Sequence, residues 1–197
     1  MDFRDVVRKR RMVRSFTDAP VAQDAVDRIL DAARRGPSAG YSQGVEFVVV
    51  TEPGRRLELV RIAAGGARML EGLQRAPAHI VICTSAEVYR RRYREPDKQR
   101  VRANMSDDDL WHVPYWYVDA GAAMMLILLA AVDEGLSAFF YGVWRQDDLK
   151  ALLGIPDEHA PIGIVTIGHA APAEPRLGSA LSRRRRPFDD IVHRERW

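Results

Sequence analysis

The stretch DAGAAMMLILLAAVDEGL, residues 119–136, decides the fold of this 197-residue chain. Its apolar part, 120–132, is shorter than the ~20 residues that a membrane-spanning helix needs, and it ends at Asp133 and Glu134. A helix that is apolar nearly all round belongs in a core, so the stretch predicts a buried helix over 119–134, ended by Gly135. A single small domain rarely encloses such a helix, and we therefore expect its outer side to face a second copy in a homodimer.

Three apolar runs predict strands that are buried on both faces. They are VEFVVVT (45–51), HIVICTS (79–85) and IGIVTIGHA (162–170), and SAFFYGV (137–143) is a further short apolar run. Helical patterns lie between them, at 2–11, 22–35, Leu57–Ala64, Met69–Leu73 and within 145–156. The alternation predicts a single α/β or α+β domain over residues 1–197, with one sheet covered by helices.

Two segments differ from this core pattern. Residues 86–118 are dense in charged and aromatic side chains and are interrupted by Pro96 and Pro114. This composition predicts an excursion over a site, similar to a lid. Residues 171–197 are rich in strand- and helix-breaking residues before a run of arginines, which predicts a C-terminal arm.

Composition also excludes several classes of protein. Cys83 is the single cysteine, so neither an internal disulfide nor a cysteine zinc site is available, and a reducing cytoplasm is expected. The N-terminus MDFRDVVRKRR carries charges where a signal peptide is apolar. The histidines lack metal-ligand spacing, so no metal site is predicted. His79 and His169 flank strands and are expected to be structural.

Arginines cluster near both ends, in RRMVRSF (10–16) and SRRRRPF (182–188). Arginine binds phosphate through a planar fork that keeps its charge. Since adjacent helical residues point apart, Arg10, Arg11 and Arg14 can converge only at a helix end or on extended chain. A solvated basic face is the alternative interpretation. Nucleic-acid binding is disfavoured, because the chain has no recognisable motif for it.

The usual catalytic motifs are absent from the sequence: there is no GxSxG, Walker loop, HExxH or GxGxxG. We therefore expect that any reactive atoms belong to a cofactor.

Five features in order resemble the flavin-dependent nitroreductase family. They are RRMVRSF, an amphipathic helix followed by PSAGYSQ and a strand, the apolar helix of residues 119–136, the strand IGIVTIGHA, and the ending R-x-R-x-P-F-x-x-I-V-H. The resemblance covers nearly the whole chain. It implies an α+β fold with a central, mostly antiparallel sheet flanked by helices. It also implies an intertwined homodimer with two FMN sites, each built from both subunits.

The resemblance assigns a set of cofactor-binding residues by position. Both arginine clusters would hold the FMN phosphate and ribityl chain, residues 37–39 would come from the partner, and the backbone of Tyr141-Gly142 would lie near the flavin N5 edge. The full set is Arg10, Arg11, Met12, Arg14, Pro37, Ser38, Ala39, Gln43, Tyr141, Gly142, Arg183 and Arg185. Met12 stands where the family often has Ser, so only its backbone could donate a hydrogen bond.

The lid is the larger departure from the family pattern. Its aromatic side chains could stack on a flat substrate, and the candidate substrate residues are Tyr89, Tyr93, Trp111, His112, Tyr115 and Trp116. The alternative is that Trp111 and Trp116 only pack the lid against the body of the protein.

The resemblance implies ping-pong transfer of electrons from NAD(P)H through FMN to a flat, electron-poor acceptor such as a nitroaromatic or a quinone. The flavin carries the chemistry, so no side chain is assigned as an acid or nucleophile. One alternative is a dedicated biosynthetic step on an unknown substrate, with another electron donor such as a deazaflavin. A second, from another class, is a non-catalytic flavin-binding module.

Overall fold

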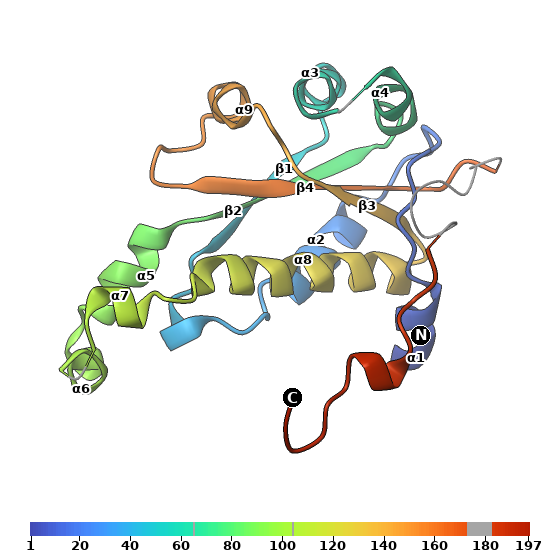
Figure 1. Cartoon of the computed structure of the whole chain (residues 1–197). Coiled ribbons are helices and arrows are strands. Elements are labelled where there is room, and N and C mark those ends of the chain that lie inside the picture. Colours follow the sequence, from blue (N-terminus) through green and yellow to red (C-terminus); the bar gives the residue numbers. More distant parts are fainter. Residues whose placement is uncertain (65, 104, 173–182) are drawn as a thin grey trace.

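A computed structural model, which describes residues 1–64, 66–103, 105–172 and 183–197, shows one sheet between two layers of helices (Figure 1). The strands are β1 (Val45–Val50), β2 (Ala78–Thr84), β3 (Ser137–Tyr141) and β4 (Ala160–Gly168). Their spatial order is β1-β2-β4-β3, and these strands pair antiparallel. The predicted α+β class with an antiparallel sheet is confirmed, and the run at 137–143 supplies the fourth strand.

The two helical layers share the side chains of the central strand β2. Val81 and Cys83 pack toward α3 (Pro53–Ala63), α4 (Ala67–Leu73) and α9 (Gln146–Leu153). Ile80 and Ile82 pack toward α2 (Gln23–Ala33) and α8 (Tyr115–Asp133) on the other face. This alternation is the period of two that a strand imposes on its side chains, and it makes β2 buried throughout.

Strand β1 does not match its prediction. The run at 45–51 was expected to be buried on both faces, but only Val50 of β1 is buried. The reason is its position, because β1 lies at the edge of the sheet and pairs with β2 alone. An apolar run cannot by itself distinguish an edge strand from a central one.

Helix α8 begins four residues before its predicted start at 119. Pro114 occupies its N-cap position, where a residue without an N–H is tolerated. Tyr115 and Trp116 therefore belong to the first turn of α8 rather than to the excursion. Residues 107–133 are long and apolar enough to cross a membrane by length and composition, but Ala120, Ile127 and Leu128 pack on the sheet as in a core helix.

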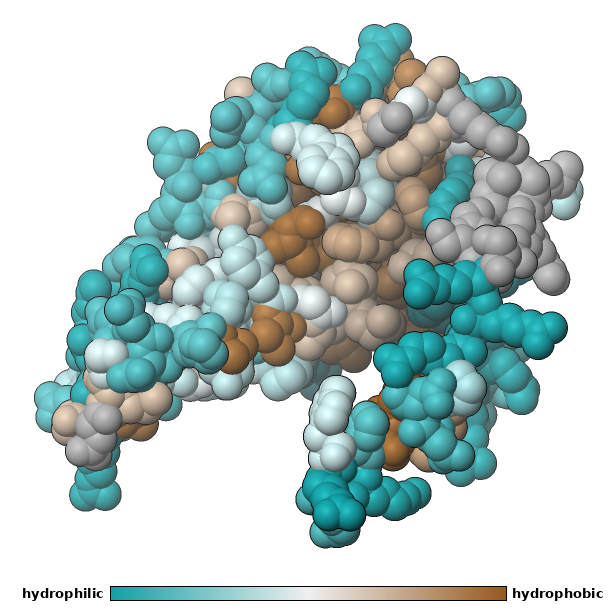
Figure 2. Space-filling view, viewed as in Figure 1, coloured by the Kyte–Doolittle hydropathy of each residue, from teal (hydrophilic) through white to brown (hydrophobic). Residues whose placement is uncertain are grey.

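The excursion folds into short helices that extend beyond the sheet beside the start of α8 (Figure 1). They are α5 (Ala86–Tyr93), η2 (Pro96–Lys98), α6 (Gln99–Arg102) and α7 (Asp107–Leu110). At the other end of α8 lie α1 (Phe3–Lys9) and the described C-terminal segment, 183–197, which contains η4 (Phe188–Asp190). Figure 2 shows an apolar surface between these two projecting parts, and α8 contributes exposed side chains such as Val118 and Met125.

Candidate functional site

The N-terminal arginine cluster begins where α1 ends. Arg10 is the C-cap residue of α1 and donates its backbone N–H to the carbonyl of Val6 at 3.0 Å. The chain then runs extended beside β3, where the N–H of Val13 bonds to the carbonyl of Ala138 at 3.1 Å. The prediction that this cluster lies at a helix end and on extended chain is confirmed.

Arg10 and Arg185 line the same cavity, although they come from opposite ends of the sequence. The cavity has a volume of about 450 Å³ and is also lined by Phe3, Arg4, Val7 and Arg8. Nη1 of Arg10 is buried and has no hydrogen-bond partner among the described residues. A buried, unsatisfied guanidinium N–H is costly, so this atom is suited to bind an anion, and a phosphate matches the fork geometry of arginine.

The other arginines predicted to bind the cofactor do not line this cavity. Arg11 lines a separate cavity of about 310 Å³, together with Lys9 and residues at the end of α8. Arg11 thus lines a different cavity from Arg10, because successive side chains of an extended segment point to opposite sides, and its contact with the cofactor stays a prediction. Arg14 donates to the carbonyl of Met12 at 3.1 Å and its guanidinium lies 4.6 Å from the ring centre of Phe139. Arg183 is exposed.

Arg4 and Arg8 also line the cavity, but they were not predicted from the sequence as site residues. They are four residues apart on α1, the spacing that places two side chains on one helical face, and that spacing was the available signal. Among the residues that the structure describes, the cavity is then lined by four guanidinium groups and no carboxylate. Arg8 also pairs with Asp5 on the same helix.

A second group of predicted residues forms a tight loop before β1. The turn η1 (Ala39–Tyr41) is closed by a bond from the N–H of Tyr41 to the carbonyl of Ser38 at 2.8 Å. Oγ of Ser38 accepts from the N–H of Gln43 at 2.7 Å. Pro37, Ser38 and Gln43 line a cavity of about 190 Å³. The structure therefore brings the predicted loop residues together.

Asp119 connects this loop to the excursion. Its side chain is buried, and Oδ2 accepts hydrogen bonds from the N–H of Ala39 at 2.8 Å and the hydroxyl of Tyr89 at 2.6 Å. Burial and the bond to Asp119 raise the pKa of Tyr89. Asp119 was not predicted as a site residue, although it is the charge that opens the apolar stretch of α8.

The aromatic residues of the excursion pack mainly on one another. The ring of Trp111 lies 5.0 Å from that of Tyr93 and 5.5 Å from that of Trp116. Tyr89 is completely buried, so the prediction that it stacks on substrate is wrong: its ring packs against Trp116 and its hydroxyl is bonded to Asp119. His112 and Tyr115 are exposed.

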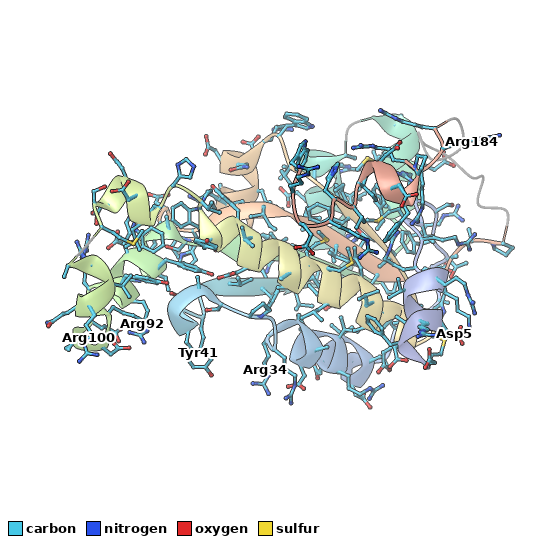
Figure 3. All side chains as sticks on the ribbon, turned by 60° about the horizontal axis from the view of Figure 1, so that its bottom comes forward. Asp5, Arg34, Tyr41, Arg92, Arg100 and Arg184 are labelled. Carbon is cyan, nitrogen blue, oxygen red and sulfur yellow. The ribbon has the colours of Figure 1, made fainter. Side chains whose placement is uncertain are left out.

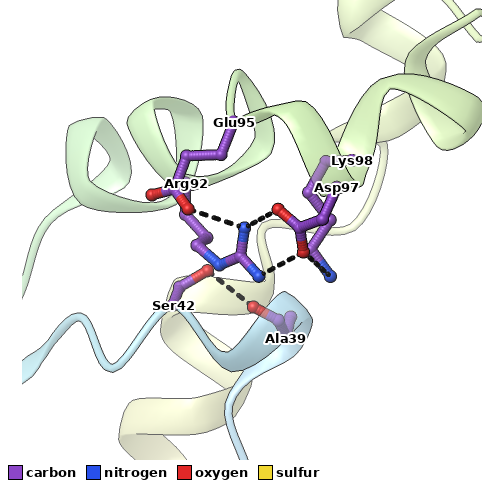
Figure 4. A network of polar contacts seen from close by, with 6 residues as sticks. All are labelled: Ala39, Ser42, Arg92, Glu95, Asp97 and Lys98. Atoms are coloured by element: carbon purple, nitrogen blue, oxygen red, sulfur yellow. Dashed lines mark hydrogen bonds and ion pairs between the residues drawn. The ribbon is translucent and has the colours of Figure 1, made fainter.

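Arg92 braces the excursion from within, where the excursion lies beside the loop. Its guanidinium binds both carboxylate oxygens of Asp97 at 2.7 Å and Glu95 at 3.0 Å, beside the turn in which Ser42 bonds to Ala39 (Figure 4). Gly40 lies directly against the ring of Tyr93. The loop and the excursion are therefore one packed unit.

Comparison with known proteins identifies the chain. Residues 7–169 match the model of the Nitroreductase family. The chain belongs to the nitroreductase family. The resemblance stated from the sequence is thus confirmed.

Relatives of this nitroreductase-family chain carry related names. A protein of Thermus thermophilus named NADH dehydrogenase is 30% identical over 87% of this chain and 88% of its own. A protein of Bacillus subtilis named FMN reductase (NAD(P)H) is 28% identical over 95% of this chain and 71% of its own. The crystal structure of a nitroreductase family protein from Streptococcus pneumoniae has a TM-score of 0.76 at 24% identity, covering 98% of this chain and 100% of that one, which shows the shared fold.

In this nitroreductase-family chain the two groups of predicted residues lie at opposite ends of α8. Asp119, near the first turn, holds the loop, whereas Asp133, in the last turn, pairs with the N-terminus of the chain beside α1. A helical rise of 1.5 Å per residue places them ~21 Å apart along the axis. Tyr41 and Arg184, both labelled in Figure 3, illustrate this separation.

Tyr141 is the last residue of β3, and Gly142 follows it. The ring of Tyr141 is buried and stacks on Phe139 at 5.5 Å, and burial raises the pKa of its hydroxyl. Gly142 is exposed, and an added Cβ would meet nothing within 4 Å. The accessible part of this segment is therefore its backbone at Gly142. No group of three or more metal-ligating side chains is found in the described part of the chain.

Proposed function

We propose that this chain works as a homodimer and passes electrons from NAD(P)H through FMN to a flat, electron-poor acceptor such as a nitroaromatic or a quinone. The chain is an NAD(P)H-dependent flavin oxidoreductase with FMN as its cofactor, in keeping with its family and with relatives named FMN reductase and NADH dehydrogenase. The nature of the acceptor and the dimer are the proposed parts. A cytoplasmic location is also proposed, from the single reduced cysteine, Cys83.

The observation that carries the proposal is Nη1 of Arg10, which is buried and has no hydrogen-bond partner in the part of the chain that the structure describes, in the cavity that Arg185 also lines. These two residues bind the phosphate of FMN, and Arg4 and Arg8 add positive charge beside it. A dianionic phosphate is held well by several guanidinium groups, because each offers two parallel N–H donors. The buried donor of Arg10 then gains the partner that it lacks among the described residues.

Two further residues contribute to cofactor binding, one through its side-chain charge and one through its backbone. Arg14, braced by Met12 and Phe139, adds positive charge next to β3. Gly142, which follows β3, is exposed and has open space around it, so its backbone N–H is available to the cofactor. When bound, FMN supplies the two-electron chemistry, and the protein contributes orientation and electrostatics.

The dimer explains why the two groups of residues are separated in one chain. A two-fold axis that reverses the direction of α8 brings the loop of one chain to the arginines of the other. The contact surface is the exposed apolar side of α8, where Val118 and Met125 are exposed. Burying such a surface is the main favourable term in association. Each flavin site would then combine Arg10 and Arg185 of one copy with residues 37–43 of the other.

The excursion covers the acceptor side of this combined site. Tyr93 and Trp111 of the excursion pack with Trp116 of α8 into a firm frame. His112 and, in the first turn of α8, Tyr115 are exposed beside it. We propose that these exposed side chains limit which acceptors reach the flavin, as expected for a lid in this family.

Cofactor retention tests the proposal. The wild-type protein should purify yellow with about one FMN per chain, and Arg10→Ala/Arg185→Ala should lose most of it. Arg55→Ala, which removes an exposed arginine of α3 on the opposite side of the sheet from α1 (Figure 1), should retain it. Full retention of FMN by the double variant would contradict the phosphate assignment.

A second experiment identifies the electron donor. The protein is mixed anaerobically with NADH, NADPH or a reduced deazaflavin, and a response to the deazaflavin alone would favour a dedicated biosynthetic step.

A further inference from the structure

Tyr41 adopts a backbone conformation that tyrosine rarely takes. Its φ is +58°, and it is followed by a second positive value at Gln43, +53°. The left-handed region costs an L-residue roughly 1–2 kcal/mol, and for a bulky residue it is an outlier. Such strain persists only where the surrounding structure enforces it, and it is concentrated at functional sites.

The loop enforces this conformation through its own hydrogen bonds. The N–H of Tyr41 bonds to Ser38, Oγ of Ser42 bonds to the carbonyl of Ala39 at 2.6 Å, and the N–H of Ala39 bonds to the buried Asp119. Gly40 is pressed against Tyr93. The backbone at Tyr41 is thus fixed by its neighbours, and its side chain has no part in fixing it.

The ring of Tyr41 gains little from its own chain. It is 73% exposed, and Figure 3 shows it projecting outward from the η1 turn. By contrast, Tyr89 and Tyr93 nearby are used in packing. An outward aromatic ring at a strained position does not stabilise the chain that carries it. We therefore infer that the ring contacts a bound ligand.

The surroundings of Tyr41 indicate what kind of ligand. It lines the 190 Å³ cavity together with Pro37, Ser38, Gln43 and Phe47, which include the loop residues that the proposed dimer places at the flavin of a second copy. A phenol ring is electron-rich, and aromatic rings prefer offset or edge contacts that match their opposite charge distributions. An electron-poor ring is therefore a suitable partner for it.

We propose that Tyr41 is a substrate-contacting residue, whose ring forms one wall of the site where a flat, electron-poor aromatic acceptor binds at the flavin of a second copy. This inference rests on the proposed function. It adds a determinant of acceptor choice outside the excursion, on the loop donated across the dimer. Since the ring acts by stacking, its hydroxyl is not required.

The test compares an aromatic acceptor with one that has no aromatic face. Steady-state KM and kcat are measured for menadione and for ferricyanide with the wild type, Tyr41→Gly, Tyr41→Asn and Tyr41→Phe. Gly and Asn both tolerate positive φ, so these variants keep the loop and relieve its strain. We expect the KM for menadione to rise about 5- to 10-fold in both, the size of an aromatic contact. The menadione KM should therefore rise relative to the ferricyanide KM in both variants, and Tyr41→Phe should keep the wild-type ratio of the two.

Three results separate the ways in which this can fail. If the wild type binds no FMN or reduces neither acceptor, the proposed function itself is wrong. If the wild type reduces both and Tyr41→Gly leaves the menadione KM unchanged, only the role of Tyr41 is overturned. If Tyr41→Gly and Tyr41→Asn lower the melting temperature and impair both acceptors equally, Tyr41 is structural, which also overturns the inference.

Discussion

The buried carboxylate of Asp119 accepts a hydrogen bond from the hydroxyl of Tyr89 at 2.6 Å, and through it α8 holds α5. The same oxygen accepts the N–H of Ala39 at 2.8 Å, so three segments meet at one atom. Tyr89→Phe removes one donor and leaves a buried carboxylate with less compensation. We expect a loss of about 1–2 kcal/mol in the free energy of unfolding, measured by urea denaturation.

The matched control is Tyr115→Phe, which removes an exposed hydroxyl a few residues before Asp119. Its stability should stay within about 0.5 kcal/mol of the wild type. Equal losses in the two variants would show that the bond between Tyr89 and Asp119 contributes nothing specific.

Most of the fold was predictable because its signals are local. The apolar runs of β2 and β4 and the helical spacing of α2 identify these elements without any knowledge of their neighbours. The exposure of β1 and the start of α8 were not predictable, because both depend on tertiary position. An edge strand and a central strand can have equally apolar sequences, and Pro114 reads as a breaker until the following turn is seen to be helical.

The candidate site shows the same division. That Arg10 and Arg185 converge followed from the family motifs, and the shared cavity is consistent with it. The pairing of Asp119 with Tyr89 was not predicted, because Asp119 was not singled out as a site residue and Tyr89 was taken as a substrate contact. Their pairing joins residues thirty positions apart, and no periodicity in the sequence reveals such a contact.

Gly72 allows the segment that carries Arg14 to lie against α4. The N–H of Phe16 bonds to the carbonyl of Gly72 at 3.2 Å, and a Cβ on Gly72 would collide with the carbonyl oxygen of Arg14. Because backbone cannot move aside cheaply, Gly72→Ala should destabilise the protein by about 1–3 kcal/mol and weaken FMN retention. Thermal unfolding and flavin absorbance measure the two effects. Gly66→Ala, where the added methyl meets open space at the N-cap of α4, should cost less stability than Gly72→Ala and leave FMN retention unchanged.

His79 makes the stability of the fold sensitive to acid. Burial, with a smaller contribution from Arg56, lowers the pKa of His79 from 6.5 to about 3. Below pH 6.5 the unfolded chain therefore binds a proton that the folded chain refuses. Stability from this group is complete above pH 6.5 and is lost progressively as the pH falls toward 3. We expect a loss of about 2 kcal/mol between pH 7 and pH 5.

Urea denaturation at several pH values measures this dependence. His79→Gln cannot titrate, so its free energy of unfolding should vary less over the same interval, even if the variant is less stable overall. A wild-type stability that stays constant from pH 7 to pH 5 would contradict the assignment.

Val118 tests whether the apolar side of α8 is a subunit interface. Its side chain is 52% exposed in the isolated chain, and the proposed dimer buries it. Val118→Arg should place an unpaired charge in that interface, which is strongly unfavourable, and should convert the dimer to a monomer in light scattering. Because each flavin site needs both copies, FMN content should fall in parallel.

Val101→Arg on α6, at 42% exposure, is the matched control and should remain a yellow dimer. A dimer that survives Val118→Arg with full flavin content would place the interface elsewhere and separate the loop at 37–43 from the arginine cavity.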